Sequence, residues 1–291
     1  RGPTKSRFLL QARTSSRREE MARYSGRIKL VVLDIAGTVC DGPQDLRHLY
    51  PNDDLKGVKS PVIAFERVFS KHNMNVDWAT IRKPMGLFKR DHLQKLLEDG
   101  TVAAEFRNAH GRDWQDRDIE DLFTEFRAVV PEVAGSKELV TPIDGVKECV
   151  DRLRAAGILI GCDTGYPKEA CEVIYRKLAD EYGIVFDVTA DSENVKGRPT
   201  PFLVFDCMEK ANVYPPEAVV KADDIEAGLH EGRNAGAWTV GLYATGDHDY
   251  ERLQKAQPDF LIASAKYLPE LVFCQIEPRL SRGDLPGQGV M

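Results

Sequence analysis

Short apolar segments that alternate with helix-like stretches constrain the fold of this chain most strongly. The first is IKLVVLD, which begins at Ile28, and similar segments recur later as ILIGCD, IVFDVTA, AVVKAD, WTVGLY and FLIAS. Helical patterns lie between the later segments, over Pro142–Ala156, Pro167–Tyr182, Thr200–Asn212 and Ala227–Ala235. Strands that alternate with helices predict a parallel α/β sheet whose functional site lies at the carboxyl ends of the strands.

A long helical insertion separates the first predicted strand from the second. Its helix-like segments include PVIAFERVFSKHN, PMGLFKRDHLQKLLE and DIEDLFTEFRAVV, and a loop at Gln44–Lys59 precedes them. We therefore expect a core domain over residues 28–45 and 140–275 and a helical cap domain over residues 46–139. Residues 1–27 are expected to be a disordered extension and residues 276–291 a flexible tail. The segments Gly42–Lys59 and Gly135–Thr141 are candidate hinges.

Composition excludes several classes of function. A net charge of −6 argues against a nucleic-acid-binding protein, and no apolar run approaches the roughly 20 residues that span a bilayer. The six cysteines form no C-x-x-C pair, so neither a zinc site nor a disulfide framework is predicted. We expect a cytoplasmic protein. The Arg- and Ser-rich beginning leaves organelle targeting open, and Met21 is an alternative start.

Polar residues at the ends of successive predicted strands carry the chemistry. Asp34 ends the first strand and can act as a carboxylate nucleophile toward phosphorus, although a capping Asp in a βα loop is the simpler interpretation. Thr164 offers a hydroxyl to a phosphoryl oxygen, and Arg198 offers a fixed positive charge. The acidic pair Asp223 and Asp224 follows a later strand.

This order of nucleophile, hydroxyl, cation and acidic pair resembles the four motifs of the haloacid dehalogenase superfamily. The resemblance implies a Rossmann-like core and a Mg²⁺ ion held by the Asp34 carboxylate, the Ala36 carbonyl and Asp224. Asp223 is then expected to support the metal ligands without binding the ion itself. The sequence leaves open which of Asp223 and Asp224 is the direct ligand. Phosphatases of the superfamily usually carry Asp at the position of Ala36, where it protonates a departing alkoxide. Its replacement predicts either impaired ester hydrolysis or a different leaving group.

The helical insertion contains a lysine on an apolar stripe. Met85, Lys89, His92 and Leu96 follow a helical 4-3-4 spacing, which places them on one face of a predicted helix. Burial lowers the pKa of a lysine, and a neutral amine can form a Schiff base with a carbonyl. Two simpler interpretations stay open: Lys89 extends to solvent, and His92 is a core histidine.

Together with Ala36, the segments DIAGT, PMGLFKRDH, TGY, GRPTP and EGRNAGAWTVG resemble the phosphonoacetaldehyde hydrolase family. The resemblance implies that Lys89 forms a Schiff base, that Met85 and His92 adjust its protonation, and that Asp34 attacks phosphorus. It further implies that the substrate phosphonate is bound by Thr164, the Gly165 backbone and Arg198, with Tyr166 lining the pocket. A homodimer formed through the caps is also implied.

Several positions depart from the family pattern. The Gln44–Lys59 loop is an apparent insertion, Asp163 replaces a small polar residue, and Gly228 stands where some relatives have an acidic residue. Two other functions therefore stay in view: a phosphatase for a small phosphate ester, and a non-catalytic protein that binds a phosphorylated ligand.

Overall fold

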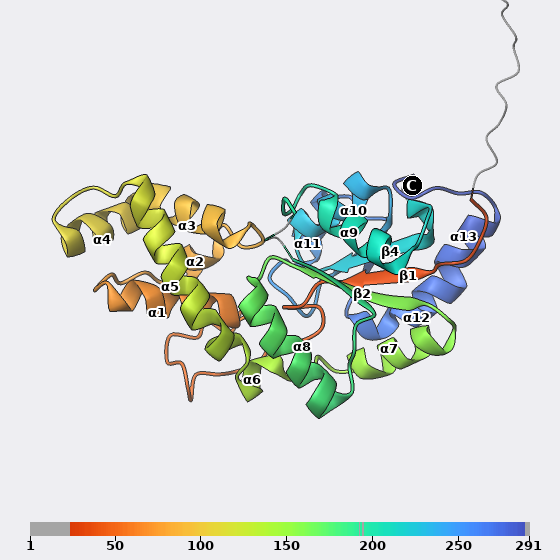
Figure 1. Ribbon diagram of the computed structural model, residues 1–291, viewed down its shortest axis with the longest axis horizontal. Helices are drawn as coiled ribbons and strands as arrows, with labels where there is room; N and C mark the ends of the chain where they lie inside the picture. The colour runs from red at the N-terminus through yellow and green to blue at the C-terminus, as the bar shows by residue number, and fades with distance from the viewer. Residues whose placement is uncertain (1–23, 192, 194, 289–291) are drawn as a thin grey trace, which may run out of the picture.

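The larger part of the molecule is built on a parallel β-sheet with helices on both sides (Figure 1). The computed structural model describes residues 24–288 except 192 and 194. Its strands are β1 (Leu30–Leu33), β2 (Leu159–Thr164), β3 (Val188–Asp191), β4 (Val219–Asp223), β5 (Trp238–Leu242) and β6 (Phe260–Ile262). They lie in the order β3-β2-β1-β4-β5-β6, with every pairing parallel. The predicted Rossmann-like α/β core is therefore confirmed.

Alternate residues of the central strand β1 pack into two different apolar layers, one on each face of the sheet. Val31 and Leu33 pack in the layer that contains α7 (Val146–Ala155) and α8 (Lys168–Tyr182). Leu30 and Val32 pack in the layer that contains α9 (Phe202–Ala211), and α10 (Glu226–Ala235) lies beside α9. Because both faces are covered, β1 is apolar throughout instead of alternating with polar residues.

The insertion after β1 forms a separate group of helices at one end of the molecule (Figure 1). It contains α1 (Ser60–Lys71), α2 (Trp78–Arg82), α3 (Lys89–Glu98), α4 (Gly100–His110), α5 (Asp116–Ala134) and α6 (Lys137–Val140). The long helix α5 packs on α1, where the rings of Phe65 and Phe126 lie 4.4 Å apart, and also on α8 of the core. One apolar cluster consequently continues from the helical cap to the sheet.

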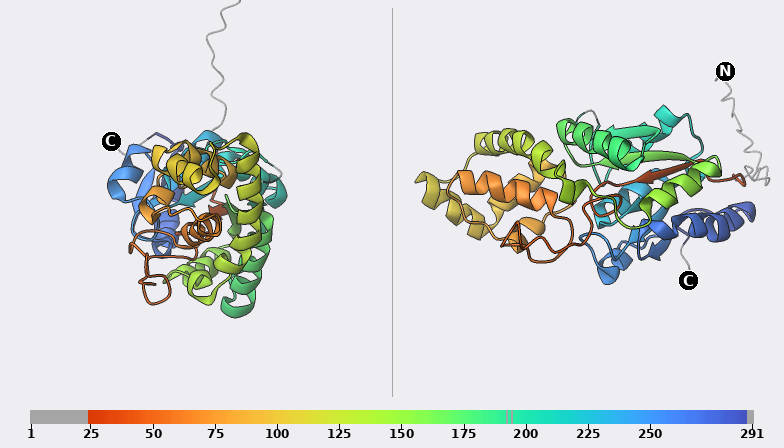
Figure 2. Two further views of the ribbon diagram at one scale, coloured as in Figure 1. Left: turned by 90° about the vertical axis from the view of Figure 1, so that its left-hand side faces the viewer. Right: turned by 90° about the horizontal axis from the view of Figure 1, so that it is seen from below.

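A helical segment near the end of the described residues packs against α7 and closes the far end of the core (Figures 1 and 2). After α11 (Tyr250–Lys255), it consists of α12 (Leu268–Leu271), a π-helical stretch (Val272–Ile276) and α13 (Glu277–Ser281). The prediction of a flexible tail from residue 276 was wrong for α13, because Ile276 and Leu280 lie one turn apart and both are buried.

The expected N-terminal extension falls mostly on residues 1–23, which lie outside the described residues. Within the described range, no helix has both the length and the apolar character needed to cross a bilayer.

Candidate active site

A narrow cavity lies where the carboxyl ends of the strands meet the helical cap. Parallel strands present their carboxyl ends at one edge, so residues far apart in the sequence converge there. The cavity contains every predicted site residue except His92 and Asp223. It is lined by Asp34, Ala36, Val58, Pro61, Met85, Gly86, Leu87, Lys89, Thr164, Gly165, Tyr166, Arg198, Asp224, Ile225 and Asp247.

Asp34 is held in a single orientation by Arg198. The Arg198 Nη2 atom donates to Asp34 Oδ1 at 2.7 Å, and Arg198 Nε donates to Glu231 Oε2 at 3.0 Å. Asp34 Oδ2 has no hydrogen-bond partner among the described residues. Burial raises the pKa of Asp34 to about 6, and the Arg198 charge opposes that rise. One oxygen is therefore fixed while the other is free to act.

A buried ionic network supports this pair from behind the cavity. Lys221, with no exposed side-chain surface, contacts Asp163 and lies 2.8 Å from Asp223 Oδ2. Arg198 also contacts Asp163. Burial disfavours the Asp163 anion, but Lys221 and Arg198 outweigh it and lower its pKa. Lys221 and Glu231 could not be predicted as part of the site, because an isolated Lys in a strand and a Glu in a helix give no local signal.

The cation-binding capacity of the site rests on Asp34 and Asp224. Carboxylate oxygens of Asp34, Asp163 and Asp223 lie within 4.8 Å of one another, but Arg198 and Lys221 already neutralise that group. Asp224 instead faces the cavity, and no basic side chain pairs with it in the described part of the chain. Burial and the charges of Asp34 and Asp223 raise the pKa of Asp224. A divalent cation between Asp34, Asp224 and the Ala36 carbonyl would offset this repulsion, so the residues fit Mg²⁺.

The turn after β1 brings Asp224 close to the backbone at Gly37. Gly37 has a φ of +85°, and a side chain there would place Cβ 2.6 Å from Asp224 Oδ2. Thr38 Oγ1 donates to Asp224 Oδ1 at 3.3 Å, and the Asp247 amide donates to Oδ2 at 3.0 Å. The glycine is thus required both by the backbone conformation and by the approach of the carboxylate.

Lys89 is buried, with 6% of its surface exposed. Its Nζ lies 3.7 Å from Met85 Sδ and 5.9 Å from the centre of the Tyr166 ring. Burial lowers the pKa of Lys89 to about 8, while Asp247 and Asp34 partly counteract that effect. A substantial fraction of the amine is therefore neutral near physiological pH.

The prediction that Met85 shares a helix with Lys89 was wrong. Helix α3 begins at Lys89, and Met85 lies in the preceding turn. Gly86 in that turn has a φ of +98°, which a helix does not accommodate. Met85 still contacts the amine, but it does so across a turn.

His92 is fully buried behind Lys89 and does not line the cavity. Its Nε2 lies 2.8 Å from the Ile81 carbonyl oxygen, so Nε2 carries the proton. Its Nδ1 has no partner within the described structure. Burial and the nearby Lys89 charge lower the pKa of His92 well below its usual value.

The phosphate-binding candidates occupy the β2 end of the cavity. The Tyr166 amide donates to Thr164 Oγ1 at 3.2 Å, which leaves the Thr164 hydroxyl proton available to a ligand. Arg198 Nη1 has no protein acceptor among the described residues. Tyr166 itself is hydrogen-bonded to Ser60 Oγ, and Ser60 donates to Asp41 at 2.6 Å. Asp41 could not be predicted to lie beside Tyr166, because it does not stand at any of the motif positions.

Asp247 was also missed from the sequence. It follows β5 in a loop and lines the cavity. The neighbouring His248 is buried and accepts from the Glu226 amide at 3.0 Å. Gly, Asp and His in a loop look like ordinary surface residues, so only tertiary structure reveals their position.

Comparison with known proteins agrees with this fold. The model of a hydrolase family, the haloacid dehalogenase-like hydrolases, matches residues 28–236. Phosphonoacetaldehyde hydrolase from Bacillus cereus strain ATCC 14579 is 35% identical over 217 residues, covering 74% of this chain and 76% of the relative. That from Nitratidesulfovibrio vulgaris is 31% identical over 285 residues, covering 90% and 96%.

A crystal structure gives the same result at the level of the fold. The phosphonoacetaldehyde hydrolase-like protein from Oleispira antarctica superposes with a TM-score of 0.80 at 27% identity, covering 91% of this chain and 98% of that one. The chain is thus a haloacid dehalogenase-like hydrolase. Within that class it belongs to the phosphonoacetaldehyde hydrolase family.

Proposed function

We propose that the chain hydrolyses phosphonoacetaldehyde to acetaldehyde and phosphate through a Lys89 Schiff base and an Asp34 phosphoryl intermediate. The observation that carries the proposal is the meeting of Lys89 and Asp34 in one cavity. The two residues come from the cap and the core. A depressed lysine pKa and a carboxylate with one free oxygen suit the two halves of this reaction.

The first half is imine formation. The neutral Lys89 amine attacks the aldehyde carbon, one proton is taken up from solvent, the carbonyl oxygen leaves as water, and a protonated imine remains. The Met85 sulfur and the Tyr166 ring surround the amine. We propose that Met85 limits its hydration and that His92, which is neutral and buried, fixes α3 behind it.

The second half is cleavage of the carbon–phosphorus bond. Asp34 Oδ2 attacks phosphorus, and the electrons of the broken bond pass to carbon to form an enamine. Water then hydrolyses the aspartyl-phosphate, and the enamine takes a proton on carbon before a second water releases acetaldehyde. The imine accepts electrons from carbon, so no acid is needed at Ala36.

The phosphonate is proposed to lie between Thr164, the Gly165 backbone and Arg198 Nη1. Mg²⁺, when bound by Asp34, the Ala36 carbonyl and Asp224, would neutralise phosphoryl charge near the nucleophile. Asp223 is proposed to orient Lys221 and Arg198 without contacting the ion. The division into a cap at residues 46–139 and a core at 28–45 and 140–275, and a homodimer formed through the caps, belong to the same proposal.

Lys89→Arg tests this function, because arginine keeps a positive charge but cannot form the imine. We expect wild-type protein with Mg²⁺ to release acetaldehyde from phosphonoacetaldehyde, and borohydride to trap a covalent adduct on Lys89. The variant should lose more than about 10³-fold in acetaldehyde release and give no adduct. Full activity in the variant would exclude the Schiff base.

The alternative of a phosphate-ester phosphatase predicts a different result. Such an enzyme would turn over small phosphate esters equally well with Lys89→Arg. Ala36 argues against it, because the cavity then lacks the acid that a departing alkoxide requires. Absence of phosphate release from any phosphonate or ester would support a non-catalytic binding protein.

A further inference from the structure

The carboxylate of Asp247 has one oxygen fixed and one without a partner. Its side chain is 6% exposed and lines the active-site cavity. Oδ1 accepts from Arg82 Nη1 at 2.7 Å and from the Val58 amide at 3.1 Å. Oδ2 is buried without a hydrogen-bond partner in the described structure. A buried carboxylate oxygen without a donor is costly, which indicates that a partner arrives with the substrate.

Lys89 is the complementary group in the same cavity. No carboxylate of the described residues lies within ion-pair distance of its Nζ, and the Met85 sulfur is its hydrogen-bond partner. The charged groups that act on it are Asp247, Asp34, Asp224 and Arg198, and neutral His92 lies on its own helix. Arg198 binds Asp34, and Asp224 is a proposed Mg²⁺ ligand. Asp247 is the carboxylate left to face the amine.

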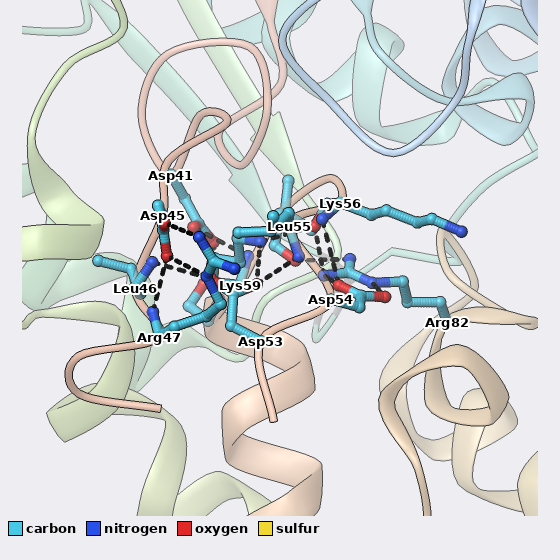
Figure 3. Close-up of polar contacts among 12 residues, drawn as sticks. Asp41, Asp45, Leu46, Arg47, Asp53, Asp54, Leu55, Lys56, Lys59 and Arg82 are labelled. Atoms are coloured by element: carbon cyan, nitrogen blue, oxygen red, sulfur yellow. Dashed lines mark hydrogen bonds and ion pairs between the residues drawn. The ribbon is translucent and has the colours of Figure 1, made fainter. Parts of the chain in front are cut away.

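Arg82 holds Asp247 in this orientation from the cap side. Its Nε and Nη2 donate to Asp54 at 3.1 and 3.2 Å (Figure 3). Its Nη1 also donates to the Val58 carbonyl at 2.7 Å. Arg82 thereby joins three elements: the Gln44–Lys59 loop, helix α2 and the loop after β5.

We propose that Asp247 is a positioning residue whose fixed negative charge stabilises the protonated imine on Lys89. This inference rests on the proposed function. When the amine nitrogen bonds to the aldehyde carbon, one proton is taken up from solvent and the carbonyl oxygen leaves as water, so a positive charge remains on nitrogen. Asp247 neither gives nor takes a proton in this step. It supplies the opposite charge in a buried site, where charges interact more strongly than they do in bulk water.

Asp247→Asn is the test, because asparagine keeps an Oδ1 acceptor for Arg82 and Val58 and removes only the charge. The matched control is Asp54→Asn, which removes a charge from the other side of Arg82 and does not line the cavity. Borohydride trapping of phosphonoacetaldehyde on Lys89 is measured against pH for all three proteins. Thermal unfolding by circular dichroism verifies that each is folded.

Loss of the anion should lower the pKa of Lys89 further. We expect the midpoint of trapping in Asp247→Asn to move about one unit to lower pH, and kcat/KM to fall roughly tenfold, with Asp54→Asn unchanged in midpoint. Asp247→Ser should shift the midpoint in the same direction, and replaces Asp247→Asn if that variant does not fold.

Three outcomes overturn the inference while the proposed function survives. The first is wild-type trapping with an Asp247→Asn midpoint that does not move. The second is an equal shift of the trapping midpoint in Asp54→Asn, which would mean that the effect acts through Arg82 and not through the charge of Asp247. The third is an unmoved midpoint with an altered Mg²⁺ dependence, which would assign Asp247 to the metal site. Failure of wild-type trapping itself would instead overturn the proposed function.

Discussion

At the scale of single residues, Lys89 shows that function and stability oppose each other in the cavity. Its folded-state pKa of about 8 lies below the roughly 10.4 of an unfolded lysine. Below pH 8 both states carry the proton, and the folded state bears the cost of a buried charge. We therefore expect Lys89→Met to abolish acetaldehyde release but to raise the free energy of unfolding at pH 7 by about 2 to 3 kcal/mol.

The sign of the pH dependence provides a check on this prediction. Between pH 8 and about 10.4 the folded lysine has lost its proton while the unfolded one retains it, so wild-type stability rises with pH. The advantage of Lys89→Met should shrink over that window in urea unfolding experiments. An advantage that stays constant with pH would show that packing, rather than charge, separates the two proteins.

Gly228 is required by the carboxylate of Asp223. A Cβ at position 228 would lie 1.9 Å from Asp223 Oδ2. We expect Gly228→Ala to destabilise the protein by about 1 to 3 kcal/mol, because Asp223 is buried among Lys221 and Arg198 and cannot move freely. In Asp223→Ala the same glycine substitution should cost much less. Additive costs in this double-mutant cycle would contradict the steric explanation.

At the scale of elements, the Gln44–Lys59 loop is organised around one buried ion pair (Figure 3). Asp53 accepts from Lys59 Nζ and from the amides of Leu46 and Leu55, each amide at 2.8 Å. Both side chains of the pair have no exposed surface. The segment that the sequence suggests to be a plain loop is thus fixed internally, and it joins Arg82 near the cavity.

Removal of Asp53 and removal of Lys59 should differ in their effect on the free energy of unfolding. Asp53→Ala leaves a buried ammonium with the Lys56 carbonyl alone and should destabilise the protein by about 3 to 5 kcal/mol. Lys59→Met leaves Asp53 with two amide donors and should cost less than half as much. Trp78, whose ring centre lies 6.0 Å from Lys59 Nζ, can report urea unfolding by fluorescence. Equal costs would contradict this account.

Most of the fold, and much of the candidate site, could be predicted because local patterns encode them. Apolar runs such as that around Val31 fix the strands, and parallel strand ends bring Asp34, Thr164 and Asp224 together. The position of Met85 could not be predicted, since a helical spacing does not reveal that Gly86 breaks the helix. The positions of Asp247 and Lys221 at the site depend on contacts between segments that are distant in the sequence. The spacing of residues along the chain does not reveal such contacts.

At the scale of the whole molecule, the cavity combines three acidic side chains, Asp34, Asp224 and Asp247, from separate segments of the core. Mg²⁺ should therefore stabilise the fold as well as support activity. We expect removal of Mg²⁺ by a chelator to abolish turnover and to lower Tm, and Mg²⁺ at a hundredfold excess over its Kd to restore about 2.7 kcal/mol. Asp224→Asn should make Tm insensitive to Mg²⁺. A Tm that still responds in that variant would mean that the ion binds elsewhere.

The overlap between Gly228 and Asp223 also restricts the order in which substitutions can accumulate in this lineage. Because a Cβ at position 228 would overlap the Asp223 carboxylate, we expect a glycine at 228 to be needed before or together with an aspartate at 223. While Asp223 keeps its contact with Lys221, we expect a larger residue at 228 to be tolerated only after that carboxylate is removed. The two positions are thus expected to vary as a pair among relatives of this chain.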